Sequence, residues 1–328
     1  MANVVVTGGC GFVGSHLVDS LVRRGDNVVV FDSQDRPGDQ TGDEANVRYV
    51  TGDIRDADQL ARVITPGVDT VYHLAALVGV DQYLKRPLDV IDVNFSGTRA
   101  VLDLAVRADA KVVFSSTSEV FGKNPDVPWT EDADRLLGST TADRWSYATS
   151  KALSEHLTFA FMRQHGLNAS IIRYFNLYGP RQRPAFLVSR SVHRALRGIA
   201  PVVYDQGRQT RSFTYVEDAI DATVTIGAST DSLGECFNVG SSDEVSIRAA
   251  VELVIELTGL DIDFDNTATR AHFGDAYQDL DRRVPDTTKM STRLGWKSTV
   301  DLRDGITRFV DWARANPWWL EQPDSAPK

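Results

Sequence analysis

Residues 4–14 read VVVTGGCGFVG, a short apolar run of β-branched residues that leads directly into a cluster of glycines. Such a run is typical of a buried strand in a parallel sheet. Beyond the glycines, apolar residues recur at helical spacing at Leu17, Val18, Leu21 and Val22. The order of strand, glycine-rich turn and helix predicts a dinucleotide site, because the free N–H groups and the dipole of a helix N-terminus attract a pyrophosphate.

Three of these glycines have separate tasks in such a turn. Gly8 permits the sharp bend, Gly11 lets a pyrophosphate approach the main chain, and Gly14 lets the helix pack closely on the strand. Phe12 and Val13 begin the helix and are expected beside the cofactor. An ordinary strand-to-helix turn is the alternative, but the element found on each side favours the dinucleotide site.

A second strand at 27–31 leads to Asp32, eighteen residues after Gly14. A carboxylate at this place accepts hydrogen bonds from the adenosine ribose and repels a 2′-phosphate. The sequence therefore predicts NAD rather than NADP, although Asp35 and Arg36 make the local charge mixed.

The rest of the first half alternates strands with helices. Strands are expected at 47–50, 70–74 and 111–114, with a long helix at 89–106, and this alternation predicts an α/β fold with a doubly wound parallel sheet. His73 is expected to be a packed strand histidine, because no second metal ligand lies at a usable spacing. The residues of this region expected at the cofactor are Asp53, Ile54, Leu74, Ala75, Ala76 and Asn94.

Composition excludes several classes of protein. The 328 residues carry a net charge of −10, which argues against a protein that binds nucleic acid through its phosphates. No apolar run reaches the length of a membrane span. The two cysteines, Cys10 and Cys236, form neither a disulfide framework nor a metal motif, so we expect a cytoplasmic protein without a bound metal.

Two stretches carry candidate chemistry. Residues 115–122, SSTSEVFG, follow the strand at 111–114, and the carboxyl ends of parallel strands are where such sheets bind ligands. Residues 143–151, DRWSYATSK, place Tyr147 and Lys151 four residues apart, on one face of a helix. A lysine beside a phenol lowers its pKa, and such a phenol can accept a proton from a sugar hydroxyl. Each motif alone is weak, because a serine-rich run usually serves as a turn or cap.

Together these motifs, in this order and approximate spacing, resemble the extended short-chain dehydrogenase/reductase family of NAD-dependent epimerases, dehydratases and decarboxylases of nucleotide sugars. The resemblance implies a Rossmann-type sheet with a smaller C-terminal α/β lobe for the substrate. It places the NAD-binding part in residues 1–170 and most of the substrate lobe in residues 171–328, with some strands of the second part returning to the main sheet. It further implies oxidation of the sugar at C4 by hydride transfer to NAD.

The same resemblance assigns roles to single residues. Thr117 would hydrogen-bond the reacting hydroxyl, Tyr147 would be the base, and Lys151 would tune the tyrosine and hold the nicotinamide ribose. Tyr174 would lie along the nicotinamide. The residues expected to contact the nucleotide sugar are Asn176, Tyr204, Arg211 and Arg283.

Glu119 narrows the choice within the family, because simple 4-epimerases need no second carboxylate. Thr-Ser-Glu resembles UDP-glucuronate decarboxylases and also GDP-mannose 4,6-dehydratases. Arg144–Trp145 and residues 276–286, AYQDLDRRVPD, resemble the decarboxylase of the lipid A 4-amino-arabinose pathway and UDP-apiose/xylose synthases. In that pattern Arg283 contacts the sugar carboxylate, and Ser118 or Glu119 assists proton transfer at C5.

The resulting prediction is a UDP-glucuronate decarboxylase that forms UDP-xylose or its 4-keto form. A 4-epimerase or 4,6-dehydratase of an uncarboxylated sugar is the main alternative, and an NAD-binding regulatory protein is another. The long helices at 89–107 and 145–165 pair across a two-fold axis in relatives, so a homodimer is expected.

Overall fold

The computed structural model describes residues 1–35, 46–268 and 280–324. Within these ranges no helix is both long and apolar enough to cross a membrane. Likewise, no group of histidine, cysteine or acidic side chains in the described part of the chain could hold a metal ion.

Seven strands of the described chain form one parallel sheet with the order β11–β6–β5–β4–β1–β2–β3. Its order reverses between β1 and β4, as in a doubly wound fold, and the predicted Rossmann-type fold is confirmed. The strands are β1 (Asn3–Thr7), β2 (Asn27–Asp32), β3 (Val47–Thr51), β4 (Thr70–His73), β5 (Lys111–Thr117), β6 (Ala169–Tyr174) and β11 (Cys236–Val239).

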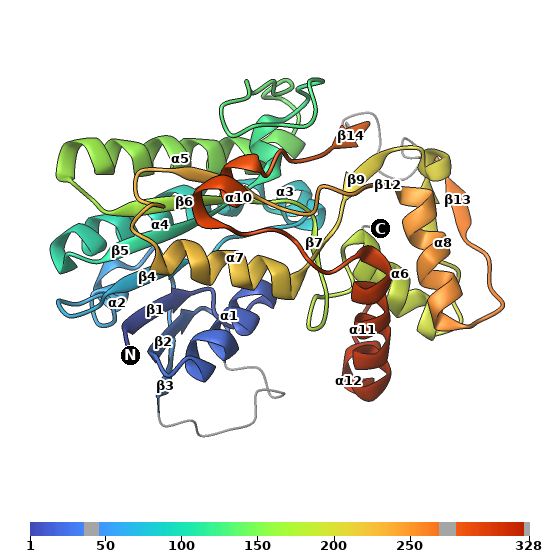
Figure 1. Ribbon diagram of the computed structural model, residues 1–328, viewed down its shortest axis with the longest axis horizontal. Coiled ribbons are helices and arrows are strands. Elements are labelled where there is room, and N and C mark those ends of the chain that lie inside the picture. The colour runs from blue at the N-terminus through green and yellow to red at the C-terminus, as the bar shows by residue number, and fades with distance from the viewer. Residues whose placement is uncertain (36–45, 269–279, 325–328) are drawn as a thin grey trace.

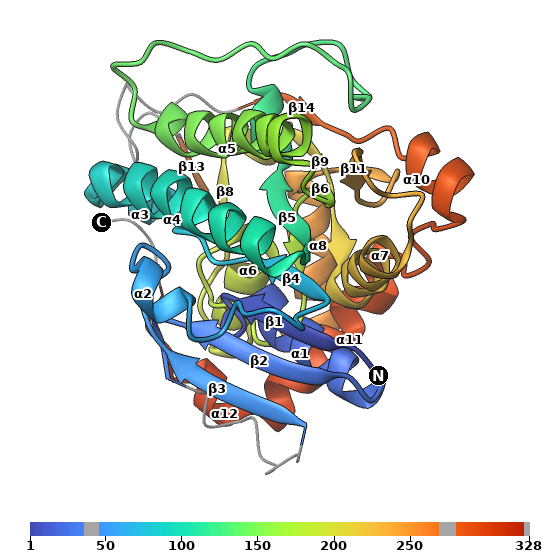
Figure 2. The same ribbon diagram turned by 90° about the vertical axis from the view of Figure 1, so that its left-hand side faces the viewer.

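Helices cover both faces of this sheet (Figure 2). One face carries α2 (Ala57–Leu60), α4 (Pro87–Ala108) and α5 (Arg144–His165), and the other carries α1 (Phe12–Arg23), α7 (Val216–Ala228) and α10 (Thr288–Leu294). Successive residues of a strand point to opposite faces. Val4 and Val6 therefore pack with α1 and α7, whereas Val5 packs with α4. Burial on both faces explains why β1 is apolar throughout.

A smaller lobe lies beyond the carboxyl ends of the strands (Figure 1). Its helices are α6 (Leu187–Leu196), α8 (Ile247–Thr258), α11 (Leu302–Ala315) and α12 (Pro317–Leu320). They enclose a separate core around Phe309 and Trp319, both fully buried. Its short strands pair as β8 (Val202–Tyr204) with β13 (Asp265–Thr267), and as β12 (Glu244–Ser246), β9 (Thr210–Ser212) and β14 (Arg282–Arg283).

The second half of the chain passes repeatedly between the sheet and the lobe. Strands β6 and β11, with helix α7, belong to the main sheet although they follow residue 168. The buried Asp218 carboxylate at the start of α7 accepts hydrogen bonds from residues 298–300, which lead into α11 of the lobe. These hydrogen bonds tie the main sheet to the lobe. The predicted domain boundary at residue 170 stays a prediction.

Candidate active site

Two glycines of the turn after β1 are required by packing. Gly8 has φ +75°, and a Cβ there would lie 2.6 Å from the Ala75 nitrogen. A Cβ on Gly14 would lie 2.1 Å from the Gly8 carbonyl oxygen. These close approaches bring the glycine turn against the segment that follows β4, which contains the predicted cofactor residues Leu74, Ala75 and Ala76.

Gly11 differs, because a Cβ there would require a much smaller shift of its neighbours than at Gly8 or Gly14. Its φ is −77°, an ordinary value, and the nearest atom to a Cβ would be the Gly8 oxygen at 3.3 Å. Gly11 is the N-cap of α1 and is exposed, and no side chain caps the helix. Phe12 and Val13 follow as the first residues of α1, each partly buried. An exposed helix N-terminus with a bare main chain fits the pyrophosphate of a dinucleotide.

We therefore expect opposite effects from two substitutions. Gly14→Ala must displace main chain and should destabilise the protein by about 1–3 kcal/mol or more. Gly11→Ala should lower the melting temperature far less than Gly14→Ala but weaken NAD binding at least about tenfold, about 1.4 kcal/mol. Thermal unfolding and calorimetric NAD titration measure both. Wild-type NAD affinity in Gly11→Ala would contradict the assignment of this turn.

Asp32 lies at the end of β2, beside the glycine turn. Its Oδ2 accepts a hydrogen bond of 2.9 Å from the Cys10 N–H, and its Oδ1 accepts one of 3.0 Å from the Gln34 N–H. Burial raises the pKa of Asp32, against the opposing effect of these donors. The neighbouring Cys10 is no nucleophile, because burial and Asp32 raise the pKa of its thiol to about 12.

Three predicted cofactor residues are engaged by the protein itself. The Asp53 carboxylate pairs with Arg55 at 2.6 Å, and Ile54 is buried against Gly97. Asn94 is 1% exposed and holds the main chain of Leu77, with its Oδ1 2.9 Å from the Leu77 nitrogen. These contacts make Asn94 a support of the loop after β4, and a direct contact with the cofactor stays a prediction.

Lys151 is buried on α5 and is directed at the sheet. Its Nζ donates a 2.8 Å hydrogen bond to the Ser115 carbonyl oxygen and lies 4.8 Å from the centre of the Phe114 ring. Burial lowers the pKa of Lys151 to about 7. Lys151 lies one turn after Tyr147 on α5, as predicted. Its hydrogen bond, however, goes to the main chain of Ser115 and not to the Tyr147 phenol.

The Tyr147 phenol lies near Thr117, the last residue of β5. Thr117 lowers the pKa of the Tyr147 phenol, and the Thr117 hydroxyl accepts a hydrogen bond of 3.2 Å from the Glu119 N–H. Burial and the Glu119 carboxylate raise the pKa of Tyr147, whereas Thr117 and Arg283 lower it. The lowered pKa expected from Lys151 is thus not found in the protein alone, because burial outweighs the favourable contacts.

Glu119 lies in the short 3₁₀ helix η1 (Ser118–Phe121), among arginines from three elements. Its Oε1 is 3.2 Å from Arg283 Nη2, and its Oε2 is 3.7 Å from Arg144 Nη2. Although burial opposes the charged form, Arg144, Arg283 and Arg211 together hold the pKa of Glu119 below its usual value. Glu119 is therefore an ionised carboxylate beside Tyr147.

Strand pairing brings the two predicted substrate arginines together. Arg283 of β14 is in register with Arg211 of β9, and both are buried. Arg283 Nη1 also reaches Asn176 Oδ1 at 3.5 Å. The adjacent Arg282 points outward to Glu244 at 2.7 Å, which is the solvated surface pair that an isolated arginine usually forms.

Comparison with known proteins agrees with this geometry. A model of the NAD dependent epimerase/dehydratase family matches residues 4–240. The chain belongs to this family. A UDP-N-acetyl-alpha-D-glucosaminuronate decarboxylase of Bacillus cytotoxicus is 36% identical, over 94% of this chain and 97% of that protein. UDP-glucuronic acid decarboxylase 1 of Arabidopsis thaliana is 34% identical, over 94% of this chain and 68% of that protein. A solved UDP-glucose 4-epimerase of Thermotoga maritima with UDP-glucose has a TM-score of 0.87 at 28% identity, covering 96% and 99% of the two chains.

As a member of the epimerase/dehydratase family, the chain is an enzyme, and the regulatory alternative is set aside. Its site contains two residues that were not among the predicted site residues, Arg144 and Tyr83. Arg144 Nη1 donates a 2.9 Å hydrogen bond to the Tyr83 hydroxyl, and both side chains are buried. Arg144 precedes Tyr147 by three residues, so the helical spacing was a signal that could have found it. Tyr83 offered no such signal.

Three other predicted residues are Ser118, which directly precedes Glu119 in η1, Tyr174 and Tyr204. Ser118 is 1% exposed. The Tyr174 hydroxyl hydrogen-bonds Thr223 on α7 at 2.6 Å, and Tyr204 lies on β8 in register with Thr267. The family roles predicted for these residues stay predictions. Arg36 and residues 276–279 of the resemblance lie outside the described part of the chain.

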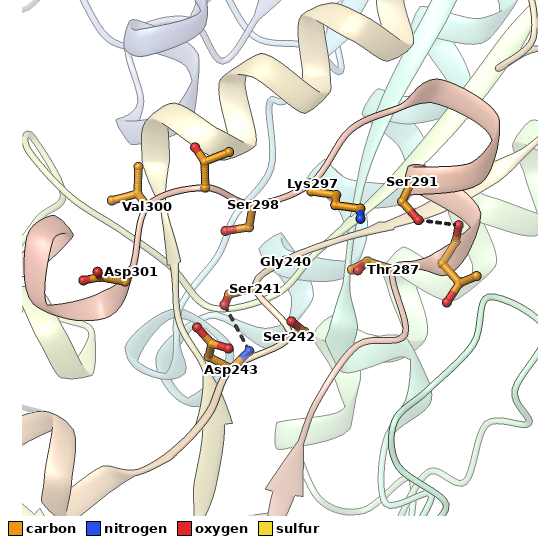
Figure 3. Close-up of a pocket in the computed structure, with 12 residues that line it drawn as sticks. Gly240, Ser241, Ser242, Asp243, Thr287, Ser291, Lys297, Ser298, Val300 and Asp301 are labelled. Atoms are coloured by element: carbon orange, nitrogen blue, oxygen red, sulfur yellow. Dashed lines mark hydrogen bonds between the residues drawn. The ribbon is translucent and has the colours of Figure 1, made fainter.

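A polar hollow of about 350 Å³ lies between the turn after β11, the start of α10 and the segment before α11. Figure 3 shows the residues that line it. Its lining contains no predicted site residue, and neither Glu119 nor the arginines around it belong to that lining. The hollow is therefore distinct from the candidate active site. The residues that line it are Gly240, Ser241, Ser242, Asp243, Thr287, Thr288, Ser291, Lys297, Ser298, Thr299, Val300 and Asp301.

Proposed function

We propose that this enzyme decarboxylates a UDP-linked uronic acid, with UDP-glucuronate as the first candidate, after oxidation of the sugar at C4. The observation that carries the proposal is the buried group of Glu119 with Arg144, Arg211 and Arg283 beside Tyr147. The decarboxylase names of two relatives point in the same direction.

The charge of this group favours an acidic sugar. Arg144 and Arg283 form ion pairs with Glu119, and Arg211 also lowers its pKa, whereas the whole chain has a net charge of −10. Arginines gathered in one place attract an anionic ligand even where the whole chain is acidic. A UDP-uronic acid supplies a diphosphate and a carboxylate, whereas an uncarboxylated UDP-hexose supplies the diphosphate alone.

The described contacts suggest how the residues divide the work. When bound, NAD supplies the hydride acceptor at C4. Tyr147 would take the proton of the C4 hydroxyl, and Thr117, which acts on the phenol from the end of β5, would hold the same oxygen. Lys151, with its pKa lowered to about 7 by burial, would bind the nicotinamide ribose and support the phenolate.

The acidic end of the sugar would lie at the arginines. A carboxylate β to a ketone loses CO2 readily, because the ketone accepts the electron pair of the broken bond as an enolate. Arg283 would orient that carboxylate, bidentate where the geometry allows. Thr117 and Tyr147 would stabilise the enolate oxygen, and Glu119 or Ser118 would assist proton transfer at C5.

Asp32 should set the choice of cofactor. A carboxylate at the end of β2 accepts hydrogen bonds from ribose hydroxyls and repels a 2′-phosphate, and like charges at one site cost several kcal/mol. We expect NAD to bind about 100-fold more tightly than NADP. Asp32→Ser should narrow this ratio, measured by titration of both cofactors. Equal affinities in the wild-type protein would contradict this role of Asp32.

A 4-epimerase or 4,6-dehydratase acting on an uncarboxylated sugar is the second candidate, because Thr117 and Tyr147 serve C4 oxidation in either case. The fold match to the solved 4-epimerase supports it. A substrate panel separates the candidates: UDP-glucuronate, UDP-N-acetylglucosaminuronate, UDP-glucose and dTDP-glucose, each followed by NMR. Conversion of either uronic acid with release of CO2 supports the proposal. Conversion of only the uncarboxylated sugars would replace it.

We also propose that the enzyme is a homodimer that pairs α4 and α5 of each chain. These helices expose Leu88 by 81%, Ile91 by 46% and Leu153 by 47%, and a second copy of the chain would cover these apolar side chains. A reducing, cytoplasmic location is proposed because both cysteines are free and buried.

Leu88→Asp should therefore change the assembly without unfolding the chain, because this side chain is exposed within one chain. Light scattering coupled to size-exclusion chromatography should give a dimer for the wild type and a larger monomer fraction for Leu88→Asp. A monomeric wild type would contradict the proposed assembly.

A further inference from the structure

The Glu119 carboxylate lies between two arginines that come from different parts of the chain. Its Oε1 faces Arg283 of β14 at 3.2 Å, and its Oε2 faces Arg144 of α5 at 3.7 Å. Each oxygen lies near its own guanidinium, but only Oε1 is hydrogen-bonded to one, because the buried Oε2 has no hydrogen-bond partner in the described chain. One carboxylate with two flanking cations is more than is needed to neutralise a buried charge.

The two cations are held very differently. Arg144 is the first residue of α5, 3% exposed, and its Nη1 is fixed by the Tyr83 hydroxyl at 2.9 Å. Its guanidinium also lies 5.4 Å from the Trp145 ring centre. Arg283 lies closer to Glu119, at 3.2 Å, but its other contact, to Asn176 at 3.5 Å, is longer than the hydrogen bond that fixes Arg144. Arg283 thus retains the capacity to accept another anion, whereas Arg144 is anchored.

We propose that Arg144, anchored by Tyr83, is a positioning residue that keeps Glu119 ionised and in place when Arg283 turns to the carboxylate of the substrate. This inference rests on the proposed function for the role of Arg283. The groups that face Glu119 are Arg144 and Tyr147 from α5, Arg283 from β14 and Arg211 from β9. When Arg283 pairs with the substrate, Arg144 is the cation that still contacts Glu119.

Four variants test this with the full-length enzyme and saturating NAD. Arg144→Gln removes the cation, Arg144→Lys keeps the charge, and Tyr83→Phe removes only the anchor of Arg144. Arg282→Gln is the matched control, because Arg282 is an exposed arginine that pairs with Glu244. The pH dependence of kcat, which reports groups of the substrate complex, is measured for each.

The expected shifts have a definite sign. A cation within about 4–6 Å lowers a carboxyl pKa by about 1–3 units, so its removal moves the acid limb of the pH profile upward by about that amount in Arg144→Gln. Tyr83→Phe should move the limb in the same direction by less, and Arg144→Lys should restore most of the wild-type profile. Arg282→Gln should match the wild type. The KM for the substrate should change less than kcat.

A second readout does not depend on turnover. Infrared difference spectra of the protein without substrate, with Glu119→Gln as the blank, report the fraction of Glu119 that is protonated across the same pH range. In the Arg144→Gln variant, Glu119 should become protonated at a higher pH than in the wild type. This result stands even where no uronic acid is decarboxylated, so failure of the proposed function and failure of this inference are distinguishable.

The inference is overturned by a folded Arg144→Gln whose acid limb and Glu119 infrared titration both match the wild type. Should that variant not fold, a Tyr83→Phe enzyme with an unchanged acid limb and unchanged infrared titration overturns it equally. A lower melting temperature with no movement of either titration would show a purely structural role for Arg144 and would also overturn it.

Discussion

Tyr147→Phe is expected to lower kcat by about 10²- to 10⁴-fold, the usual contribution of a positioned acid–base group. The phenol hydroxyl lies with Thr117 at the end of β5, where the reacting sugar hydroxyl is proposed to bind. Phenylalanine keeps the buried ring and removes only the proton acceptor. Binding of NAD and of the nucleotide sugar should therefore change little, so the effect should fall on kcat rather than on KM.

The matched control is Tyr215→Phe, which removes a buried phenol oxygen from the core of the lobe. It should cost stability without a comparable loss of kcat. Steady-state kinetics and calorimetric NAD titration of both variants test the expectation. A Tyr147→Phe enzyme that keeps more than about a tenth of the wild-type kcat would remove the base from the proposed mechanism.

Arg283→Gln is expected to lower kcat/KM for UDP-glucuronate by about 100- to 1,000-fold. Removing one partner of a buried charge pair costs about 2–5 kcal/mol, and each 1.36 kcal/mol is tenfold. The loss should be far smaller for UDP-glucose binding, because that sugar has no carboxylate for Arg283 to orient. The comparison of the two ligands separates loss of recognition from general damage to the site.

Arg282→Gln supplies the control, since the adjacent arginine lies on the same strand but points outward to Glu244. Its kcat/KM should stay near that of the wild type. Equal losses for Arg282→Gln and Arg283→Gln, or equal losses for both sugars in Arg283→Gln, would contradict the proposed carboxylate contact.

Prediction from the sequence succeeded where the signal was local. The glycine turn is defined by contacts within a few residues and by one close neighbour, Ala75, so its spacing was enough to predict the strand, turn and helix. The apolar strands likewise predicted the parallel sheet, because a strand buried on both faces is apolar throughout.

The environment of Glu119 could not be predicted in the same way. Its partners come from residues 25 and 164 positions away in the chain, and only the folded lobe brings β14 beside η1. The expected effect of Lys151 on Tyr147 also failed for a three-dimensional reason. The lysine is directed to the Ser115 carbonyl, and burial of the phenol outweighs the favourable contacts.

The most direct test follows the carbon that the arginines are proposed to release. UDP-glucuronate labelled with ¹³C at C6 is incubated with the enzyme and NAD, and ¹³C NMR follows the label. We predict that labelled CO2 and bicarbonate appear together with an equal amount of UDP-linked pentose. Label that stays at C6 while UDP-glucose or dTDP-glucose is converted would contradict the account.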